Sequence, residues 1–555
     1  MEKYKYINYP NPRARRDNFM MLNGMWDFAF LEEFKLPKYY DKKIKVPFTY
    51  ETIESGINDQ NMHNYLAYHK TFVADTSKNY LLHFDGVDYK CEIYINKKLA
   101  YEHQGCYSPF YFSIKDYLKE GENEIDVLVF DSFDKSQLRG KQRTRCENYD
   151  CWYTQYSGIY ENVYLEECGD FYVKNAKFSG NLDGQVNYDI ELARPSSIEI
   201  EITFKGELVY KKVLSETKNR FLANIKLENP NLYDHNQPNL YDVKIKTIDD
   251  EFNTYFGFIE IESKDGSIFI NKNKTYLKMV LNQGYYLKKG ISGEAKDIIK
   301  DLESIKYIGF NGVRIHQKQE SHIFYYICDC LGIYIWSEIP SAYEYSEKMK
   351  QEYLRELERI IERNYNSPSV IVYVLFNESW GIPDINKEVE CQEFVKKSGD
   401  FARKLDNKRL IILNDGWYQL ETTDILSLHE YDQDALNFKN EYKDKNYVVN
   451  TKIINGYGKA LAKNNSYKGQ PIIISEFGGA SLSSSSGWGY GNKIDGQEAY
   501  IEQLKKMFNT IHSLDYISGY CYTQFCDVEQ ETNGLFFENR VPKIPLDQLK
   551  VIIGG

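Results

Sequence analysis

The chain is 555 residues long, with 42% hydrophobic and 27% charged residues and a formal net charge of −12. At about 150 residues per domain, this length predicts three or four domains, or three if one is an α/β barrel of about 250 residues. The sequence has no run of about 18 apolar residues, no apolar secretory leader and no basic patch, so we expect neither a membrane span nor a nucleic-acid partner. The ten cysteines match neither zinc-ligand nor CxxC spacing, which indicates reduced thiols and a cytoplasmic location.

The first two segments of the chain are expected to be all-β. Residues 1–168 alternate apolar and polar side chains over short stretches between turn-forming residues, and the expected strands include 70–73, 80–84, 91–95 and 124–130. This pattern predicts a β-sandwich of the jelly-roll-like kind. Residues 169–262 repeat it on a smaller scale, with strands expected at 197–204 and 240–246, and their number fits one immunoglobulin-like β-sandwich.

From residue 263 to residue 555 the pattern changes to strands that alternate with amphipathic helices. Eight apolar runs are expected to be strands, at 276–281, 312–315, 333–336, 370–376, 410–413, 425–428, 471–475 and 517–522. Helices are expected around 295–307, 347–363 and 497–514, where apolar residues recur at helical spacing. Eight β/α units in this length predict a C-terminal (β/α)₈ barrel.

Polar side chains lie in or directly after nearly every one of these eight runs. In such a barrel the working residues project from the carboxyl ends of the strands, which all meet at one rim. In strand order they are Arg314 and His316, Glu338, Asn377 and Glu378, Asp415 and Trp417, His429, Glu476, and Tyr522 and Gln524. The sequence therefore predicts an active site at this rim.

Two carboxylates, Glu378 and Glu476, follow strands four and seven and are expected to face each other across the barrel mouth. Carboxylates are costly to bury unless a partner or a function retains them. Two carboxyl groups about 5–5.5 Å apart suit a glycosidase that retains anomeric configuration. One, ionised, attacks the anomeric carbon, and the other, kept protonated by its neighbour's charge, protonates the departing oxygen and then activates water.

Several motifs in this order resemble glycoside hydrolase family 2, including its β-galactosidases and β-glucuronidases. The barrel part carries Phe310-Asn-Gly-Val-Arg314, Asn377 directly before Glu378, and Ser475-Glu476-Phe477-Gly478. Asn23-Gly-Met-Trp-Asp-Phe28 and Tyr156-Ser-Gly-Ile-Tyr160 are similar to the family's sugar-binding sandwich, and Tyr255-Phe-Gly-Phe258 to the end of its immunoglobulin-like domain. The resemblance covers nearly the whole chain.

This resemblance implies a role for each candidate residue. Glu378 would be the acid/base, Glu476 the nucleophile, and Asn377 the partner of the sugar 2-hydroxyl. The other predicted substrate-binding residues are Arg314, His316, Trp417, His429, Tyr522 and Gln524. No metal and no organic cofactor are implied. The substrate would be a small oligosaccharide or glycoside, and a homo-oligomer is compatible with the sequence.

The motifs around the expected pocket depart from the usual family pattern, which points to a divergent branch. The stretches Lys278–Gly284 and Ile315–Lys318 differ, and the Asn-x-Lys element that many glucuronidases use to bind a carboxylate is absent near Asn533. We therefore expect a retaining exo-β-glycosidase with a β-galactoside favoured. A β-glucuronide, another β-glycoside or an α-L-arabinoside is the alternative, with Lys318, Lys493 and Arg540 as candidate carboxylate binders.

Two interpretations from other classes stay open at this point. Glu338, Glu378 and Asp415 follow consecutive strands and could form a magnesium site of the kind that oxygen ligands make. The chain could also be a non-catalytic carbohydrate-binding protein on an inactive barrel. The magnesium interpretation leaves Glu476 and both sandwiches without a function, and the retention of both glutamates disfavours the second.

Overall fold

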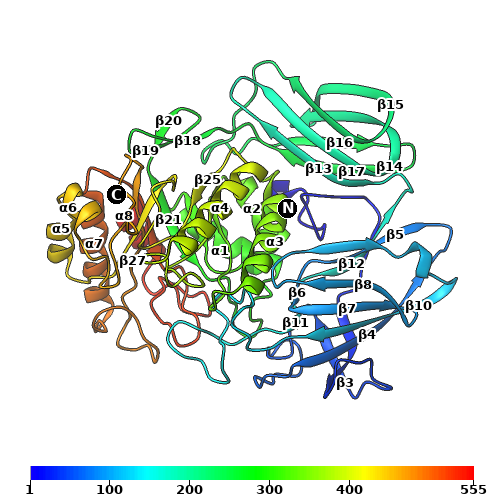
Figure 1. Cartoon of the computed structure of the whole chain (residues 1–555), viewed down its shortest axis with the longest axis horizontal. Helices are drawn as coiled ribbons and strands as arrows, with labels where there is room; N and C mark the ends of the chain where they lie inside the picture. Colours follow the sequence, from blue (N-terminus) through cyan, green and yellow to red (C-terminus); the bar gives the residue numbers. More distant parts are fainter. Residues whose placement is uncertain (1, 555) are drawn as a thin grey trace.

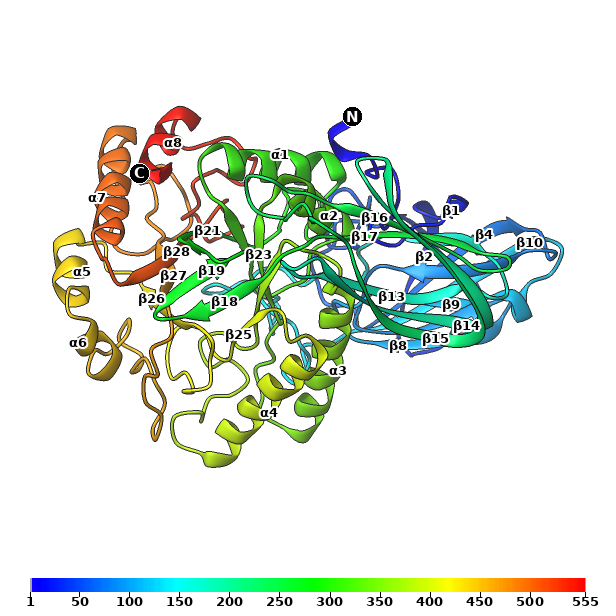
Figure 2. The ribbon, with the colours of Figure 1, turned by 90° about the horizontal axis from the view of Figure 1, so that it is seen from above.

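The computed structural model describes residues 2–554. Two β domains lie on one side of a barrel, and both approach it closely (Figure 1; Figure 2). The first sandwich pairs a four-stranded sheet with a six-stranded sheet around a core that includes Trp26, Phe28 and Tyr68. In spatial order, the smaller sheet is β1 (Phe19–Met21), β12 (Val163–Cys168), β5 (Asn79–Phe84) and β9 (Phe110–Ser113). The larger is β3 (Lys42–Val46), β2 (Gly24–Leu31), β4 (Tyr65–Ala74), β10 (Gly121–Phe130), β7 (Lys90–Ile95) and β8 (Lys98–Gln104).

Two short strands, β6 (Val87–Asp88) and β11 (Gly158–Ile159), form a separate pair in the same domain. The alternation that predicted β7 is visible in its burial, because Cys91, Ile93 and Ile95 are buried while Lys90, Glu92 and Tyr94 are partly exposed. Side chains of a strand point alternately to the two faces of its sheet, so one face of β7 covers the core.

The second domain is built on a long hairpin. Its strands are β13 (Val173–Gly180), β14 (Gln185–Phe204), β15 (Glu207–Lys226), β16 (Tyr241–Lys246) and β17 (Glu251–Phe256). The first half of β14 pairs with β13 and its second half with β16, while β15 runs antiparallel along its length with register shifts between Glu191 and Ile198. The core includes Ile190, Ile200 and Val243.

A small meander leads into the barrel: β18 (Ile261–Lys264), β19 (Ser267–Ile270) and β20 (Asn273–Thr275). Ile268 and Ile270 of β19 pack in one apolar cluster with Leu277 and Met279 of the first barrel strand and with Trp336. The meander therefore covers the amino-terminal end of the barrel and leaves the opposite end for the site.

The barrel has eight parallel strands in the order β25-β24-β23-β22-β21-β28-β27-β26. They are β21 (Leu277–Asn282), β22 (Gly312–Ile315), β23 (Tyr334–Glu338), β24 (Val370–Val374), β25 (Leu410–Ile412), β26 (Leu426–Glu430), β27 (Ile472–Gly478) and β28 (Ile517–Thr523). A parallel bridge between Gly416 and Leu428 nearly closes the ring between β25 and β26. All eight predicted runs are strands, so the predicted fold is confirmed.

Helices surround these strands: α1 (Ala295–Tyr307), α2 (His322–Leu331), α3 (Glu347–Asn364), α4 (Val389–Leu405), α5 (Ala435–Tyr442), α6 (Lys445–Asn450), α7 (Gln497–His512) and α8 (Leu546–Gly554). The local sequence determines where α3 begins, because the Ser346 side chain accepts a hydrogen bond from the Met349 amide and caps the first turn of the helix. Leu357, Ile360 and Ile361 recur on one face of α3 and are buried against the barrel.

A long loop of the first sandwich, residues 131–157 between β10 and β11, extends to the barrel mouth (cyan in Figure 1). The Gly140 amide donates to the Ser341 carbonyl at 3.0 Å, and the Thr154 amide to Glu529 at 3.0 Å. Gly140 has a φ of +58°, and a Cβ there would lie 1.8 Å from the Gln317 carbonyl oxygen. Only glycine allows this close approach of the two domains.

Candidate active site

The predicted rim residues converge on one guanidinium, that of Arg314 in β22. It is fully buried and donates to Glu338 at 2.8 Å, to Glu476 at 3.0 Å and to the Asn377 Oδ1 at 2.7 Å, and it also pairs with Asp415. Burial by itself would lower the pKa of Arg314. The neighbouring carboxylates raise this pKa by more than burial lowers it, so the guanidinium stays charged. Four residues, from β23, β27 and the segments after β24 and β25, are thus held around one cation.

The charge of Arg314 in turn keeps two of its partners ionised. Burial raises the pKa of Glu338, but Arg314 and His316 outweigh it and bring the pKa to about 2. For Asp415, burial is likewise outweighed by Arg314 and His429, and its pKa is well below the usual range. Neither side chain can therefore serve as a proton donor at neutral pH.

Glu378 and Glu476 face each other across this cluster. One carboxylate oxygen of Glu378 and one of Glu476 lie within 4.8 Å of each other and of a ring nitrogen of His429. Glu476 accepts hydrogen bonds from Arg314 and the Tyr431 hydroxyl, whereas Glu378 has a side chain 19% exposed and contacts His429 Nδ1 at 2.8 Å. Glu378 has a φ of +49°, a left-handed backbone conformation that is uncommon for residues other than glycine.

Electrostatics distinguish Glu476 as a permanent anion. Burial raises its pKa, but the charges of His429 and Arg314 outweigh burial and lower it below the ordinary value. For His429, burial lowers the pKa, and Glu476 and Asp415 raise it to about 10. His429 is therefore an imidazolium that donates from both nitrogens, with Nε2 3.3 Å from Asp415 and 3.4 Å from Glu476.

The charge on His429 predicts how stability depends on pH. Because its folded pKa of about 10 exceeds the ordinary histidine value of 6.5, its stabilising contribution is complete below pH 6.5 and is lost as the pH rises through 10. The difference in melting temperature between the wild type and His429→Gln should thus shrink from pH 6.5 to pH 10, as measured by calorimetry at one scan rate. Between pH 5.5 and 6.5 the two curves should run parallel, and a constant difference up to pH 10 would contradict the charged state.

Two groups of side chains carry the atom types of metal ligands. In the first, the charged His429 leaves no nitrogen lone pair free beside Glu378 and Glu476. In the second, His69, Glu124 and Asp126 on the first sandwich already hold the Lys97 ammonium, at 3.2 Å from Glu124 and 2.9 Å from Asp126. The magnesium interpretation also fails on geometry, since the Arg314 guanidinium lies between Glu338 and Asp415.

The two glutamates open into a small enclosed cavity of about 20 Å³. Among the predicted site residues, its wall contains His316, Asn377, Glu378 and Glu476. Asn377 Nδ2 is buried there without a hydrogen-bond partner among the described residues, so it is a free donor. This volume holds about one water molecule, so the surrounding side chains must move before a larger ligand enters.

Three predicted substrate-binding residues, Trp417, Tyr522 and Gln524, do not line the cavity. Trp417 stacks on Tyr457 at 4.6 Å and contacts the back of His429. Tyr522 lies between Phe477 and Phe508, with ring centroids 5.5 Å from each. Gln524 donates to the Asn533 Oδ1 at 2.7 Å, and Asn533 donates to Glu531, which does line the cavity.

Nine further residues line the cavity that were not among the predicted site residues: Lys141, Cys151, Leu281, Gln283, Trp380, Tyr431, Tyr490, Thr523 and Glu531. Tyr431 is two residues past His429 and Trp380 is two residues past Glu378, and these positions beyond β26 and β24 were the available signals. Tyr490 stacks on Tyr431 at 3.4 Å. Lys141 and Cys151 come from the 131–157 loop of another domain, and no motif marks them.

The three candidate carboxylate binders have partners elsewhere. Lys318 donates to the Gly284 carbonyl at 2.9 Å and pairs with Glu320, and Arg540 pairs with Asp301 at 3.3 Å. Lys493 binds a loop carbonyl at the surface. Each cation is thus engaged outside the cavity wall.

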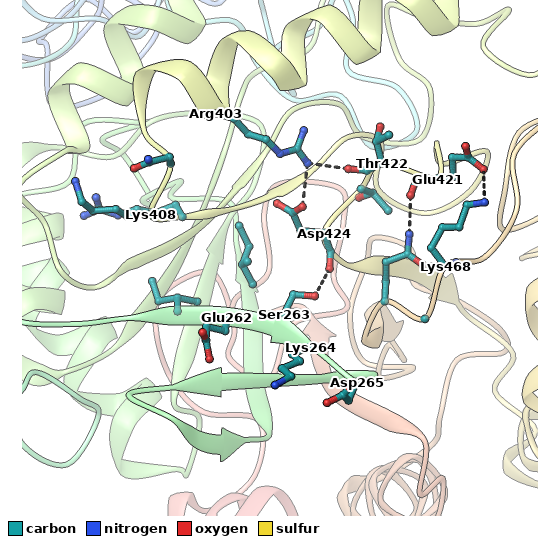
Figure 3. A pocket seen from close by; sticks show the side chains of 17 residues that line it. Glu262, Ser263, Lys264, Asp265, Arg403, Lys408, Glu421, Thr422, Asp424 and Lys468 are labelled. Atoms are coloured by element: carbon teal, nitrogen blue, oxygen red, sulfur yellow. Dashed lines mark hydrogen bonds and ion pairs between the residues drawn. The ribbon is translucent and has the colours of Figure 1, made fainter. Parts of the chain in front are cut away.

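The largest of the described hollows, about 670 Å³, lies elsewhere, between the β18–β19 hairpin and the loops before β25 and β27 (Figure 3). Two of its cations are already paired, Arg403 with Asp424 at 2.9 Å and Lys468 with Glu421 at 3.2 Å. It is on the side of the barrel that the meander covers, away from the carboxyl ends of the strands, so size alone does not identify the site.

Comparison with known families agrees with this geometry. The model described as "Glycosyl hydrolases family 2, TIM barrel domain" matches residues 261–554, more than half of the chain, and the "sugar binding domain" of the same family matches residues 33–168. The chain belongs to glycoside hydrolase family 2. The resemblance seen in the sequence motifs is thereby confirmed.

Individual family 2 relatives carry two kinds of name. A putative beta-glucuronidase of Formosa agariphila is 26% identical, over 66% of this chain and 47% of that protein, and a beta-galactosidase of Thermoanaerobacter pseudethanolicus is 27% identical, over 62% and 47%. The chain thus spans about half the length of these curated relatives. Among residues 2–554, no helix combines the length and the apolar character that crossing a bilayer requires.

Solved family 2 structures match the fold over almost the whole chain. The beta-glucuronidase of Bifidobacterium dentium aligns with a TM-score of 0.81 at 18% identity, covering 99% of this chain and 98% of that one. A beta-galacturonidase from Eisenbergiella tayi aligns with a TM-score of 0.78 at 19% identity, covering 99% and 98%. At these identities the likeness describes the fold.

Proposed function

We propose that the chain is a retaining exo-β-glycosidase in which Glu476 is the nucleophile and Glu378 the acid/base. The observation that carries the proposal is the approach of the two carboxylates, whose nearest oxygens lie within 4.8 Å. Retaining enzymes hold their carboxyl groups about 5–5.5 Å apart, whereas inverting enzymes leave about 6.5–9.5 Å for a water molecule.

The surroundings of each glutamate suit its proposed role. Glu476 receives donors from Arg314 and Tyr431 and is next to the charged His429, so it is an oriented anion ready to attack the anomeric carbon. Glu378 is the more exposed of the two, with 19% against 6% of its side chain accessible. That position lets it exchange a proton with the leaving group and then with water.

The reaction would proceed in two displacements. Glu476 forms an ester bond with the anomeric carbon while the bond to the leaving oxygen breaks and Glu378 gives that oxygen its proton. Glu378 then takes a proton from a water molecule, which attacks the same carbon and releases Glu476 as carboxylate. The free Nδ2 of Asn377 is in position to donate to a hydroxyl of the bound sugar.

Removal of single terminal sugars follows from the shape of the site. The 131–157 loop covers the barrel mouth, and the cavity between the glutamates is enclosed rather than an open groove. Once its side chains have moved to admit a sugar, a pocket closed off in this way can hold the end of a chain and not its middle. The substrate is proposed to be a β-galactoside or a β-uronide, since the relatives carry names of both kinds.

The experiment that tests this proposal follows the anomeric configuration of the product. With the members that are hydrolysed in a panel of aryl β-galactoside, β-glucuronide, β-galacturonide, β-glucoside and α-L-arabinoside, proton NMR should show first the product anomer that matches the substrate, before mutarotation. Inversion would exclude the double displacement. Sugar binding without turnover on any member of the panel would instead indicate a non-catalytic carbohydrate-binding protein.

A further inference from the structure

Lys141 is a cation inside the candidate active site that the proposed reaction does not use. It comes from the 131–157 loop of the first sandwich, is 5% exposed, and lines the same cavity as Glu378 and Glu476. Its backbone is held firmly, because the Tyr153 amide donates to the Lys141 carbonyl at 2.8 Å. Its ammonium nitrogen lies 5.5 Å from the Trp380 ring and 5.6 Å from the Tyr153 ring.

No carboxylate oxygen of residues 2–554 lies within the 4.0 Å ion-pair distance of this ammonium, and the carboxylates of the cavity all have other donors. Glu476 binds Arg314 and Tyr431, and Glu378 binds His429. Glu531 accepts from the Tyr153 hydroxyl with one oxygen and from Asn533 at 3.0 Å with the other. Lys141 is therefore a charged member of the cavity wall that has no ion-pair partner among residues 2–554.

A buried ammonium without a partner is costly, because burial removes its hydration. Burial lowers the pKa of Lys141, but Cys151, Glu531 and Glu476 raise it by more, so the group stays charged. The Cys151 thiol does not neutralise it, since burial outweighs Lys141 and raises the pKa of Cys151 to about 11. The two aromatic rings compensate the charge only in part, by cation–π contact.

We infer that Lys141 binds the carboxylate of a terminal uronic acid, and that the substrate of this site is a β-D-uronide. A uronic acid carries a carboxylate where the neutral hexose carries a hydroxymethyl group, so the ring seated between the glutamates presents an anion to the wall around it. Nζ supplies three donors and a full charge to that anion. This inference rests on the proposed function and names its substrate class.

A neutral sugar accounts less well for Lys141. A hydroxyl accepts a hydrogen bond from an ammonium but leaves its charge uncompensated in a buried site. The cavity is moreover already supplied with groups that serve hydroxyls, among them the free Nδ2 of Asn377. A glucuronide and a galacturonide share the carboxylate and differ only at C4, so Lys141 selects the class and not the member.

The test compares matched aryl substrates. For the wild type, kcat/KM on the better of the β-glucuronide and the β-galacturonide should exceed that on the β-galactoside. Lys141→Met, nearly equal in volume and uncharged, should lower the uronide-to-galactoside ratio of kcat/KM by roughly 100-fold, mainly through KM, because one partner of a buried charge pair is removed. Lys141→Arg should restore part of the ratio. Lys264→Met in the distant groove is the control and should leave the ratio unchanged.

Each outcome separates the two claims. A wild type that hydrolyses no member of the panel overturns the proposed function itself. A wild type that prefers the galactoside, with a ratio that Lys141→Met changes less than about threefold, overturns the role of Lys141 and leaves the glycosidase intact. If Lys141→Met does not fold, inhibition of the wild type decides: free D-glucuronate or D-galacturonate should inhibit at least tenfold more tightly than D-galactose, and equal inhibition overturns the inference.

Discussion

Glu476→Gln is expected to lower kcat on an aryl β-glycoside by about 10⁴-fold or more, because removal of a nucleophile leaves only binding and positioning to accelerate the reaction. The amide is nearly the same size, its oxygen can still accept a hydrogen bond from Arg314, and its NH2 group can donate to the Tyr431 hydroxyl, so the fold and substrate binding should persist. Steady-state kinetics, together with a binding isotherm for the free sugar, measure both parts.

The control for this substitution is Glu262→Gln, an exposed glutamate in the groove at the other end of the barrel, which should keep full activity. Turnover of Glu476→Gln within tenfold of the wild type would refute the nucleophile assignment. A circular dichroism spectrum and melting temperature near those of the wild type are required for either conclusion, because the amide removes a charge from a buried ionic cluster.

Glu378→Ala is expected to lose most activity on substrates whose leaving group needs protonation and least on substrates whose leaving group departs without it. General acid catalysis contributes about 10²–10⁴-fold, so a loss of about 10³-fold is expected on an alkyl glycoside, whose leaving oxygen is strongly basic. On a 2,4-dinitrophenyl glycoside, formation of the glycosyl-enzyme should be nearly as fast as in the wild type. A plot of log kcat/KM against leaving-group pKa should therefore become much steeper.

An equal loss on all leaving groups would contradict Glu378 as the acid. If the steep dependence appeared instead in Glu476→Gln, the two roles would be exchanged. Ser379→Ala is a neighbouring control, since this hydroxyl lies at the same turn but accepts from Asn414 and has no part in the proposed reaction.

The two substitutions act on charge states that Arg314 and His429 maintain together. Four carboxylates lie around these two cations, and the cations hold Glu476, Asp415 and Glu338 as anions in a buried site. In a low-dielectric surrounding such fixed charges act strongly and need no rearrangement during the reaction. The site is thus prepared for charge to develop on the sugar before substrate arrives.

The sequence by itself determined the barrel, the all-β class of the first two domains and the location of the two glutamates at one rim of the barrel. Eight apolar runs of four to seven residues could be recognised because barrel strands are buried on both faces and alternate with helices of apolar period 3.6. Since the carboxyl ends of parallel strands share one rim, Glu378 and Glu476 could be assigned to a common site while lying 98 residues apart in the numbering.

Only the tertiary structure decided which way individual side chains point and what another domain adds. Tyr522 is the last residue of the expected strand 517–522, and its ring packs toward Phe508 of α7, because strand residues alternate between the barrel interior and the surrounding helices. Lys141 and Cys151 reach the cavity through a loop whose local sequence carries no sign of it. Contacts between residues hundreds of positions apart depend on how whole domains dock, which no local periodicity encodes.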